Sequence, residues 1–316
     1  MIRMKNKIVP IMFGLIKSAT FFNSLSIKKT GGTIRADYCY SVWLRHLYYW
    51  NTFRNEMPKT VAELGPGDSL GTSLAALLSG ADRIVVLDIV KYWDADRNLE
   101  IFEELVLLFK NKKDVPGNET FPKIRPKISN YSFPSAIISD ELLKKSLSVD
   151  RLDKIRKELT DIENPNNKYI KCQIPWNIDA KVKESSVDFI FSQAVMEYVE
   201  DLDKIYTLMG KWLKSNGLVS HTIDFKSDGI TKTWNGHWTF SKFQWRIIKG
   251  NKKVIINRKP LSYHLEYLEK NDFEILELQN IVSCNLIKRS ELSAEFSLIT
   301  DVDMQTSGSY ILAGKK

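Results

Sequence analysis

Cysteine is scarce in this sequence, which has 3 cysteines in 316 residues, at Cys39, Cys172 and Cys284. They are far apart, odd in number and without a C-x-x-C pair, so neither a disulfide framework nor a zinc ribbon is indicated. The metalloprotease motif H-E-x-x-H is also missing, and we predict no metal site, with Mg²⁺ held by Asp224, Asp228 and a substrate diol as the alternative. Free thiols suit a reducing compartment, and we therefore expect a cytoplasmic protein.

Long apolar runs are missing as well. The nearest is residues 8–16, which Pro10 and Gly14 interrupt and Lys17 ends. It follows early positive charge, as in a signal peptide, but no A-x-A cleavage site comes after it. It is also far shorter than the roughly 20 residues that span a bilayer. We predict a packing segment within an N-terminal helical extension of residues 1–57, with weak peripheral contact to a membrane surface as the alternative.

Positive charge is in excess, at a net +8, but no long basic run concentrates it. Such an excess favours anionic partners, since clustered lysines and arginines bind phosphate in a salt-dependent way. Short groups of this kind are typical of solvated surface, so the charge argues only weakly for a nucleic-acid partner. The groups are Lys28-Lys29, Lys110 with Lys112-Lys113, Lys123 with Arg125 and Lys127, Lys144-Lys145, and Lys252-Lys253 with Arg258-Lys259.

Short apolar runs rich in β-branched and aromatic residues alternate with longer helical patterns from Thr60 onward. This alternation is typical of a doubly wound α/β sheet. We predict a Rossmann-like, seven-stranded, mostly parallel sheet with helices on both faces, and a helix over residues 261–271. The expected strands are residues 60–64, 83–88, 168–172, 187–191, 218–223, 274–282 and 309–314.

The clearest helical pattern follows Ser192, where apolar residues recur at three- and four-residue spacing up to Leu213. Asn216-Gly217 supplies a left-handed stop for that helix. About 80 residues separate the second and third strands, more than a crossover needs, which predicts an insertion over residues 92–167. Prolines between Pro116 and Pro134 predict irregular chain there, and the second half of the insertion should form one or two helices. The main domain would then be residues 58–316.

A glycine-rich turn lies between the first strand and the helix after it. Gly65 and Gly67 let the backbone approach a ligand without a Cβ in the way. Asp88 ends the second strand, 21 residues beyond Gly67, where a carboxylate accepts hydrogen bonds from ribose hydroxyls. This layout serves NAD and S-adenosylmethionine equally.

Glu63-x-Gly65-x-Gly67 resembles motif I of the class I S-adenosylmethionine-dependent methyltransferases, in which the acid helps to hold the amino acid part of the cofactor. Dinucleotide enzymes usually carry a small apolar residue there, and their third glycine would fall at Leu70. Residues 186–199 and 213–217 are similar to the family's fourth strand and to its turn before strand five. The resemblance implies S-adenosylmethionine as cofactor and methyl transfer as the activity.

Several residues are expected to hold that cofactor, some from the motif and some from their place at strand ends. Residues 171–176 lack the acid that many family members place after strand three to contact adenine, so Trp176 is the candidate for packing against that ring. A core position is the alternative for Trp176. The full set is Glu63, Gly65, Pro66, Gly67, Asp88, Ile89, Trp176, Ser192 and Gln193.

The Asn/Asp-Pro-Pro-Tyr motif that the family uses for amine and base N-methylation would begin at Ser192 and is missing. An O-methyltransferase needs a base near the ends of strands four and five, and the candidates are Asp224, His221 and His237. The side chains of the strand that contains His221 point alternately to its two faces, so a place in the core is the alternative for His221. Capping of a turn is the alternative for Asp224.

The segment 225–260 is aromatic and basic from Trp234 to Trp245, and we expect it to shape the acceptor side of the site. Either a stacking platform for sugars or nucleic acid or a packed lid fits this composition. Arg258 would clamp an anionic substrate group or form an ordinary ion pair.

We predict O-methylation of a small polar, anionic molecule or a glycan. The alternatives are an RNA methyltransferase, although no appended RNA-binding module is evident, and a cofactor-binding protein without catalysis, because no base is compelling. An NAD-dependent enzyme is disfavoured by Glu63 and Leu70 and by the lack of a recognisable Tyr-x-x-x-Lys pair.

Overall fold

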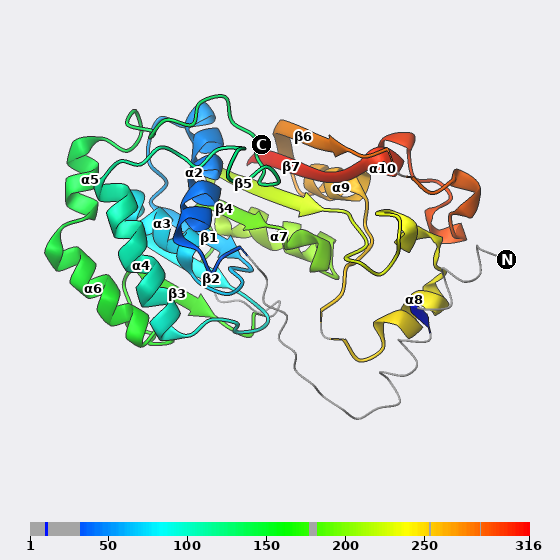
Figure 1. Cartoon of the computed structure of the whole chain (residues 1–316), viewed down its shortest axis with the longest axis horizontal. Coiled ribbons are helices and arrows are strands. Elements are labelled where there is room, and N and C mark those ends of the chain that lie inside the picture. Colours follow the sequence, from blue (N-terminus) through cyan, green and yellow to red (C-terminus); the bar gives the residue numbers. More distant parts are fainter. Residues whose placement is uncertain (1–9, 12–31, 177–181, 253, 285) are drawn as a thin grey trace.

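The computed structural model describes residues 10–11, 32–176, 182–252, 254–284 and 286–316 (Figure 1). The predicted apolar segment of residues 8–16, apart from its residues 10–11, lies outside them, as do Lys28, Lys29 and Lys253. No helix of the described ranges combines the length and the apolar character needed to cross a membrane.

The described residues build one seven-stranded sheet in the order β3-β2-β1-β4-β5-β7-β6. β7 pairs antiparallel with both of its neighbours, and the remaining pairs are parallel. The first five strands follow the 3-2-1-4-5 order of doubly wound nucleotide-binding sheets, which confirms the predicted fold class. The strands are β1 (Thr60–Leu64), β2 (Arg83–Leu87), β3 (Ile170–Gln173), β4 (Val187–Gln193), β5 (Leu213–Asp224), β6 (Phe273–Val282) and β7 (Thr306–Lys315).

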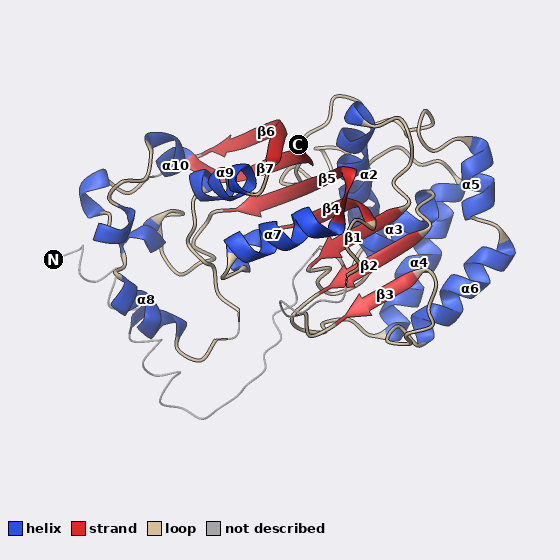
Figure 2. Ribbon diagram, turned by 180° about the vertical axis from the view of Figure 1, so that it is seen from behind, coloured by secondary structure: helices blue, strands red, loops and turns tan. Residues whose placement is uncertain are grey.

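Helices cover both faces of the sheet. Figure 2 shows α7 and α9 over the face turned to the viewer, whereas α2, α3 and α4 pack together on the other face. The longer helices are α2 (Ala36–Phe53), α3 (Gly71–Ser79), α4 (Ala95–Lys110), α5 (Asp140–Ser146), α6 (Val149–Thr160), α7 (Leu202–Trp212), α8 (Lys242–Lys249), α9 (Leu261–Lys270) and α10 (Asp301–Gln305). Short 3-10 turns are η1 (Met196–Tyr198), η2 (Gly236–Thr239), η3 (Arg289–Glu291) and η4 (Ala294–Phe296).

The central strand β4 feeds two separate apolar cores because successive side chains of a strand point to opposite faces. Phe189 and Phe191 belong to the core under α2, α3 and α4, while Ile190 belongs to the core under α7 and α9. Both faces are therefore buried, and only the ends of the strands remain for binding a ligand.

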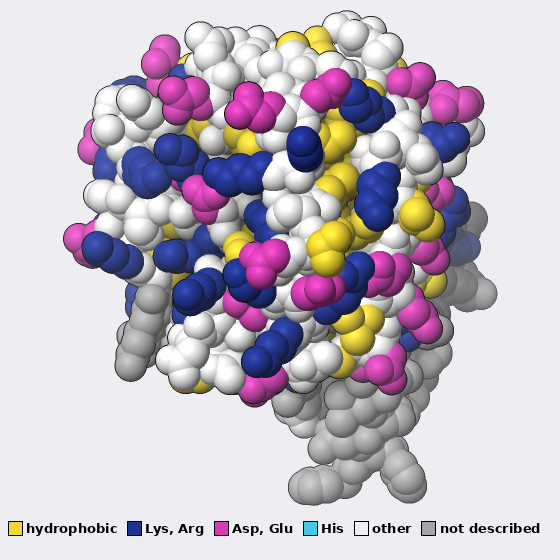
Figure 3. Space-filling model, turned by 90° about the vertical axis from the view of Figure 1, so that its left-hand side faces the viewer, with side chains coloured by type: hydrophobic (Ala, Val, Ile, Leu, Met, Phe, Trp, Pro, Cys, Tyr) yellow, Lys and Arg dark blue, Asp and Glu magenta, His cyan; other side chains and the backbone are white. Residues whose placement is uncertain are grey.

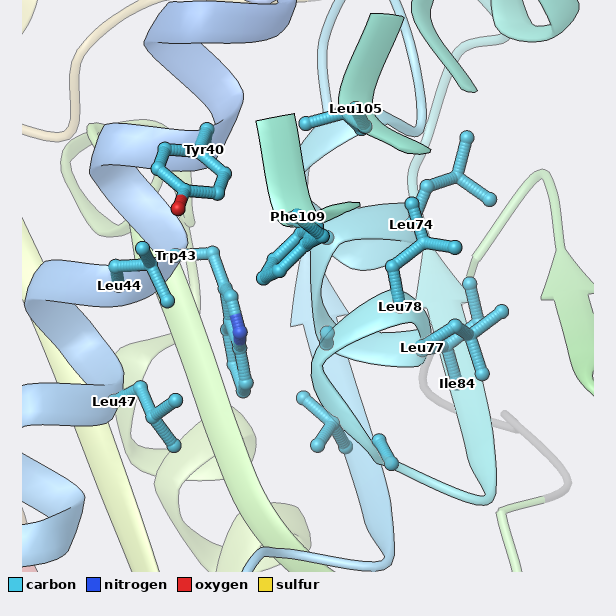
Figure 4. Close-up of a cluster of buried hydrophobic side chains, with 14 of the residues drawn as sticks. Tyr40, Trp43, Leu44, Leu47, Leu74, Leu77, Leu78, Ile84, Leu105 and Phe109 are labelled. Atoms are coloured by element: carbon cyan, nitrogen blue, oxygen red, sulfur yellow. The ribbon is translucent and has the colours of Figure 1, made fainter. Parts of the chain in front are cut away.

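Helix α2 is an integral part of the first core. Its Trp43 lies with its ring centroid 5.7 Å from that of Phe191 and donates a 2.9 Å hydrogen bond through Nε1 to Ser79 Oγ on α3. Figure 4 shows Trp43 between the leucines of α2 and those of α3, with Phe109 of α4 alongside. Packing of this kind fixes α2 against the sheet through buried apolar area.

Two details of the predicted helix after β4 are wrong. The helix begins at Leu202, where the Asp201 side chain accepts from the Lys204 amide at 3.1 Å, because Ala194 takes a positive φ of 56° and turns the chain first. It ends at Trp212, since Leu213 is already extended and pairs with Val187 in the sheet. Asn216-Gly217 lies inside β5, and neither residue adopts the left-handed conformation.

The long connection between β2 and β3 contains α4, α5 and α6, and its second half is helical as predicted. Residues 111–139 form neither helix nor strand, and the buried Arg45 of α2 holds them. Its guanidinium donates to the carbonyls of Pro116, Pro126 and Ile124 at 3.0, 3.1 and 3.4 Å. It also lies 5.0 Å from the centre of the Tyr131 ring.

The charge on the face that carries α5 and α6 is mixed. Figure 3 shows lysines and arginines there interspersed with aspartates and glutamates. Several of the cations are in surface ion pairs, such as Arg156 with Glu103 at 2.6 Å and Lys154 with Asp150 at 2.6 Å. This distribution agrees with the expectation of dispersed charge on that face.

We expect Arg45→Ala to lower the free energy of unfolding by about 3 kcal/mol, because three carbonyls around the insertion lose their donor. Urea unfolding gives the magnitude, and hydrogen exchange should show faster opening of residues 115–134. The exposed Lys123→Ala is the matched control and should change neither quantity. Equal exchange in both variants would contradict the assigned role of Arg45.

Candidate functional site

The turn after β1 requires glycine at its first position. Gly65 has φ of 65° and Gly67 has φ of 77°, a region that side-chain-bearing residues rarely adopt. The Gly65 amide donates to the Leu87 carbonyl at 2.8 Å, which continues the β1–β2 pairing by one residue. A Cβ on Gly65 would lie 2.6 Å from Val195 Cγ2, so the loop after β4 is in close contact with the turn.

Asp88 follows β2 directly and faces this turn. Its Oδ1 accepts from the amides of Ile89 at 2.7 Å and Val90 at 3.2 Å. Burial raises the pKa of Asp88 to about 6, and hydrogen bonds from the amides of Val90, Ile89 and Gly67 partly oppose that rise. The carboxyl group therefore lies beside Gly67, as the sequence predicts for a group that binds ribose.

Glu63 lies beneath the turn and is buried in the protein interior. The Ser73 hydroxyl of α3 donates to its Oε2. Burial raises the pKa of Glu63 to about 8, hydrogen bonds from Ser73 lower it, and the charge of Asp88 raises it. The two acids of the motif are thus electrostatically coupled at one end of the sheet.

The chain just before α2 covers the far side of the turn. Thr33 Oγ1 accepts from the Asp68 amide at 2.9 Å, and the Thr33 carbonyl accepts from the Ser69 hydroxyl. On the other side, Asn98 Oδ1 of α4 accepts from the Leu70 amide at 2.8 Å. The turn is therefore held from two elements, which fixes its backbone for binding.

Two further residues of the predicted cofactor set, Ile89 and Trp176, lie beside Asp88. Ile89 is 45% exposed. The Trp176 amide donates to the Asp88 carbonyl at 2.5 Å, while its half-buried ring packs edge-on toward Trp212, with centroids 6.4 Å apart. Trp176 thus has both the place expected of a cofactor contact and the apolar packing of a core residue.

Pro66 lies within the turn, and Ser192 and Gln193 lie beside it at the end of β4. Pro66 is buried, and Ser192 is the β4 residue that pairs with Leu64. The Ser192 hydroxyl bonds to a histidine on β5 at 2.8 Å, and Gln193 Oε1 lies 3.2 Å from His46 Nε2. Both side chains thus bond to histidines. The groups of this strand end that remain for a ligand at the turn are those of the main chain.

The structure places His221, the histidine bonded to Ser192, in the core. It is fully buried, and its ring packs edge-on toward Tyr206 at 6.2 Å. Burial lowers the pKa of His221 to about 3, with smaller contributions from His46 and His264. Of the two predicted roles of His221, this burial favours the place in the core over that of a base.

A small pocket lies at the carboxyl end of β5. It joins four segments: the loop after β4, the end of β5 with the residues directly after it, η2, and the chain before α9. It brings together Asp224 and His237 of the predicted bases, but His221 is not part of its lining. The lining residues are Glu197, Asp224, Phe225, Lys226, His237, Ile256, Asn257, Arg258 and Lys259.

Asp224 and His237 have different surroundings. Asp224 is ion-paired, since its Oδ1 accepts from the Lys226 amide at 2.9 Å and from Lys226 Nζ at 3.1 Å. His237 is buried, and its Nδ1 has no partner among the described residues. Burial, followed by the charge of Arg258, lowers the pKa of His237 to about 3, so its ring is neutral at neutral pH.

Glu197 lines the same pocket and is not among the residues predicted from the sequence. It is 5% exposed, and its Oε2 has no hydrogen-bond partner among the described residues. Burial raises the pKa of Glu197 well above the usual range of a carboxylic acid. The available signal was its place shortly after β4, at the edge of the sheet where such folds bind ligands.

Asn257 attaches the segment 225–260 to the loop after β4. Its Nδ2 donates to the carbonyls of Met196 at 2.8 Å and Val199 at 2.7 Å. Its amide donates to the Glu197 carbonyl at 2.6 Å. One side chain and one amide thus set the position of η1 relative to the pocket.

Arg258 holds the same segment together internally. Its guanidinium pairs with Glu295 at 2.8 Å, donates to the Phe240 carbonyl at 2.8 Å, and lies within 4.8 Å of the centres of the Trp245 and Phe296 rings. Of the two predicted roles, the ion pair is therefore the one present.

The aromatic stretch of residues 234–245 is mainly buried, and Trp238 and Phe240 have no exposed surface. Trp238 Nε1 donates to the Arg258 carbonyl at 2.8 Å. This arrangement supports the packed-lid alternative over an exposed stacking platform. We call residues 225–260 the lid segment, and Figure 1 shows it beyond the tip of the β5 arrow.

No group of three or more histidine, cysteine, aspartate and glutamate side chains in the described part of the chain is arranged to hold a metal ion.

No family model matches the sequence, and no curated protein matches it. Solved structures give distant likenesses. A SAM-dependent methyltransferase from Methanosarcina mazei is 14% identical, with 84% of this chain and 96% of that chain covered and a TM-score of 0.44. Geranyl diphosphate C-methyltransferase from Streptomyces coelicolor A3(2) is 13% identical, with 86% and 79% covered and a TM-score of 0.45. At TM-scores below 0.5, such likenesses assign neither an activity nor a site to this chain.

We expect Gly65→Ala to destabilise the protein by about 1–3 kcal/mol more than Gly229→Ala, since both glycines have positive φ but only Gly65 contacts a side chain there. Urea unfolding of the two variants measures the difference. Adding Val195→Ala to Gly65→Ala should recover part of the loss. Equal destabilisation by the two single substitutions would mean that Val195 yields without cost.

Proposed function

We propose that this chain is an S-adenosylmethionine-dependent methyltransferase that transfers the methyl group to an oxygen of a small polar molecule or a glycan. The observation that carries the proposal is the arrangement at the ends of β1 and β2. There, a turn with two left-handed glycines lies between the buried acid Glu63 and the acid Asp88, whose carboxyl group is beside Gly67.

The residues around the turn fit S-adenosylmethionine better than a dinucleotide. A dinucleotide site needs its third glycine so that the helix can approach the strand closely. That position is Leu70, which is fully buried and part of the first core. The acid Glu63 also stands where dinucleotide sites have a small apolar residue, and its carboxyl group lies under the turn.

The cofactor, when bound, supplies an electrophilic methyl group on a sulfonium. The protein then has to hold the acceptor oxygen in line with that methyl group and keep water away, and such positioning accounts for much of the rate. The glycine turn, Asp88 and Glu63 would hold the cofactor, and the lid segment would shape the acceptor pocket beside it. The pocket meets the loop that contacts Gly65 through Val195.

The charges at the pocket favour a polar, anionic acceptor. Lys226 and Lys259 both line it, and Lys259 has no carboxylate within ion-pairing distance among the described residues. Nucleic acid is less well supported, because Trp238, Phe240 and Trp245 are buried in the lid segment and offer no stacking surface, whereas Phe243 is exposed. We further propose a cytoplasmic protein, with the N-terminus as the place of any peripheral membrane contact.

A cofactor-binding protein without catalysis is the second candidate function. It is favoured by the state of two predicted bases, since Asp224 is ion-paired with Lys226 and His221 is buried in the core. The two functions share the cofactor site and differ only at the pocket. A screen of hydroxylated acids and nucleotide sugars for formation of S-adenosylhomocysteine separates them.

We expect Asp88→Ala to weaken binding of S-adenosylhomocysteine at least about tenfold, because a charge-assisted hydrogen bond is worth about 1.5–3 kcal/mol. Calorimetric titration measures the affinity, with NAD as the competing ligand. The exposed Asp96→Ala on α4 is the control and should bind as the parent chain does. Tight NAD binding, or no binding of the sulfur nucleosides to the parent chain, would overturn the proposal.

The pH dependence of that affinity should follow Asp88. Only the ionised carboxylate accepts a hydrogen bond on both oxygens, and the pKa of Asp88 is raised to about 6. Affinity should therefore fall as pH drops below about 6, by up to about tenfold per pH unit, in a range where Glu63, whose pKa is about 8, stays protonated. Titrations in this range with Asp88→Asn should show a flat profile. The same slope in both proteins would assign the effect to another group.

A further inference from the structure

The side chain of Glu197 lies in the pocket without a partner that would explain its burial. Burying a carboxyl group costs free energy unless hydrogen bonds or an opposite charge compensate it. Burial raises the pKa of Glu197, and hydrogen bonds with the backbone of Glu197 and of Asp224 lower it by less. One carboxyl oxygen, Oε2, has no partner among the described residues.

Each cation that lines the pocket has another partner, although the charge of Lys226 lowers the pKa of Glu197 and that of Asp224 raises it. Lys226 pairs with Asp224 at 3.1 Å, and Arg258 pairs with Glu295 at 2.8 Å. Lys259 Nζ lies over the Tyr263 ring, 4.3 Å from its centre. The remaining pocket group that titrates, His237, is buried and uncharged at neutral pH.

The loop after β4 brings Glu197 close to the glycine turn. Val195, two residues earlier, contacts Gly65, and Asn257 holds the backbone of η1 on both sides of Glu197. Glu197 therefore lies on the loop that contacts the glycine turn of the proposed cofactor site.

We infer that Glu197 contacts the methyl acceptor through Oε2 and takes the proton from its hydroxyl group. This inference rests on the proposed function. The acceptor oxygen forms its bond to the methyl carbon while the carbon–sulfur bond breaks, and that electron pair goes to sulfur, which leaves S-adenosylhomocysteine. The hydroxyl proton passes to Glu197 and then to solvent. Burial raises the pKa of Glu197, which makes its carboxylate a stronger base for this proton.

The inference can be tested by binding alone, without knowing the acceptor. Sinefungin carries a protonated amine where S-adenosylmethionine has its methylated sulfonium, whereas S-adenosylhomocysteine has no charge there. A carboxylate within reach of the acceptor atom should attract that amine. We expect Glu197→Gln to reduce the ratio of sinefungin affinity to S-adenosylhomocysteine affinity about tenfold, while the affinity for S-adenosylhomocysteine stays within about twofold.

Glu200→Gln is the matched control, because Glu200 lies three residues further on, is exposed and pairs with Lys249. It should leave the ratio unchanged. Glu197→Asp keeps the charge and shortens the side chain, so it should give an intermediate ratio and serves if Glu197→Gln does not fold. An unchanged ratio in both Glu197 variants, with both nucleosides bound, would overturn the inference alone. No binding of either nucleoside to the parent chain would overturn the proposed function and this inference with it.

Discussion

The hydrogen bond from the Gly65 amide to the Leu87 carbonyl is the contact on which the candidate site depends. It carries the parallel register of β1 and β2 one residue past the strands, so that the glycine turn and Asp88 leave the sheet side by side. Leu64 pairs with Ser192 in the same row, which places the loop after β4 against that turn. That loop in turn sets the position of the lid segment, because Asn257 of the lid segment bonds to it.

The sheet and the glycine turn were predictable because their signals are local. Strands buried on both faces appear as short apolar runs, and the first two, over residues 60–64 and 83–88, agree with β1 and β2 to within one residue. The helix after β4 was misplaced because its apolar period continues across residues 195–213 and does not show that Ala194 turns left-handed. The division of the chain into an extension, a main domain and an insertion stays a prediction.

The pocket could be predicted only in part, because its character comes from residues far apart in the chain. Asp224 was found from its place at the end of a strand. Glu197 was not, because its burial depends on Asn257 and Arg258, about 60 residues further on. Likewise the choice between a platform and a lid depends on Glu295, which neutralises Arg258 from beyond the segment and lets the aromatic rings close around it. Nothing in the local sequence records such a pairing.

Consecutive residues of α2 connect two distant parts of the molecule: Arg45 binds the insertion, and His46 bonds to Ser220 and to Gln193 at the end of β4. Apart from the Tyr131 ring, the insertion presents main-chain oxygens to Arg45. Any residue can supply such an oxygen, so the exposed side chains of residues 111–139 are free to diverge while the path over the helix is kept, whereas Phe133 and Ile138 are fixed by their place in the first core. This part of the chain has the freedom to acquire new surface chemistry in evolution without disturbing the strand ends that α2 supports.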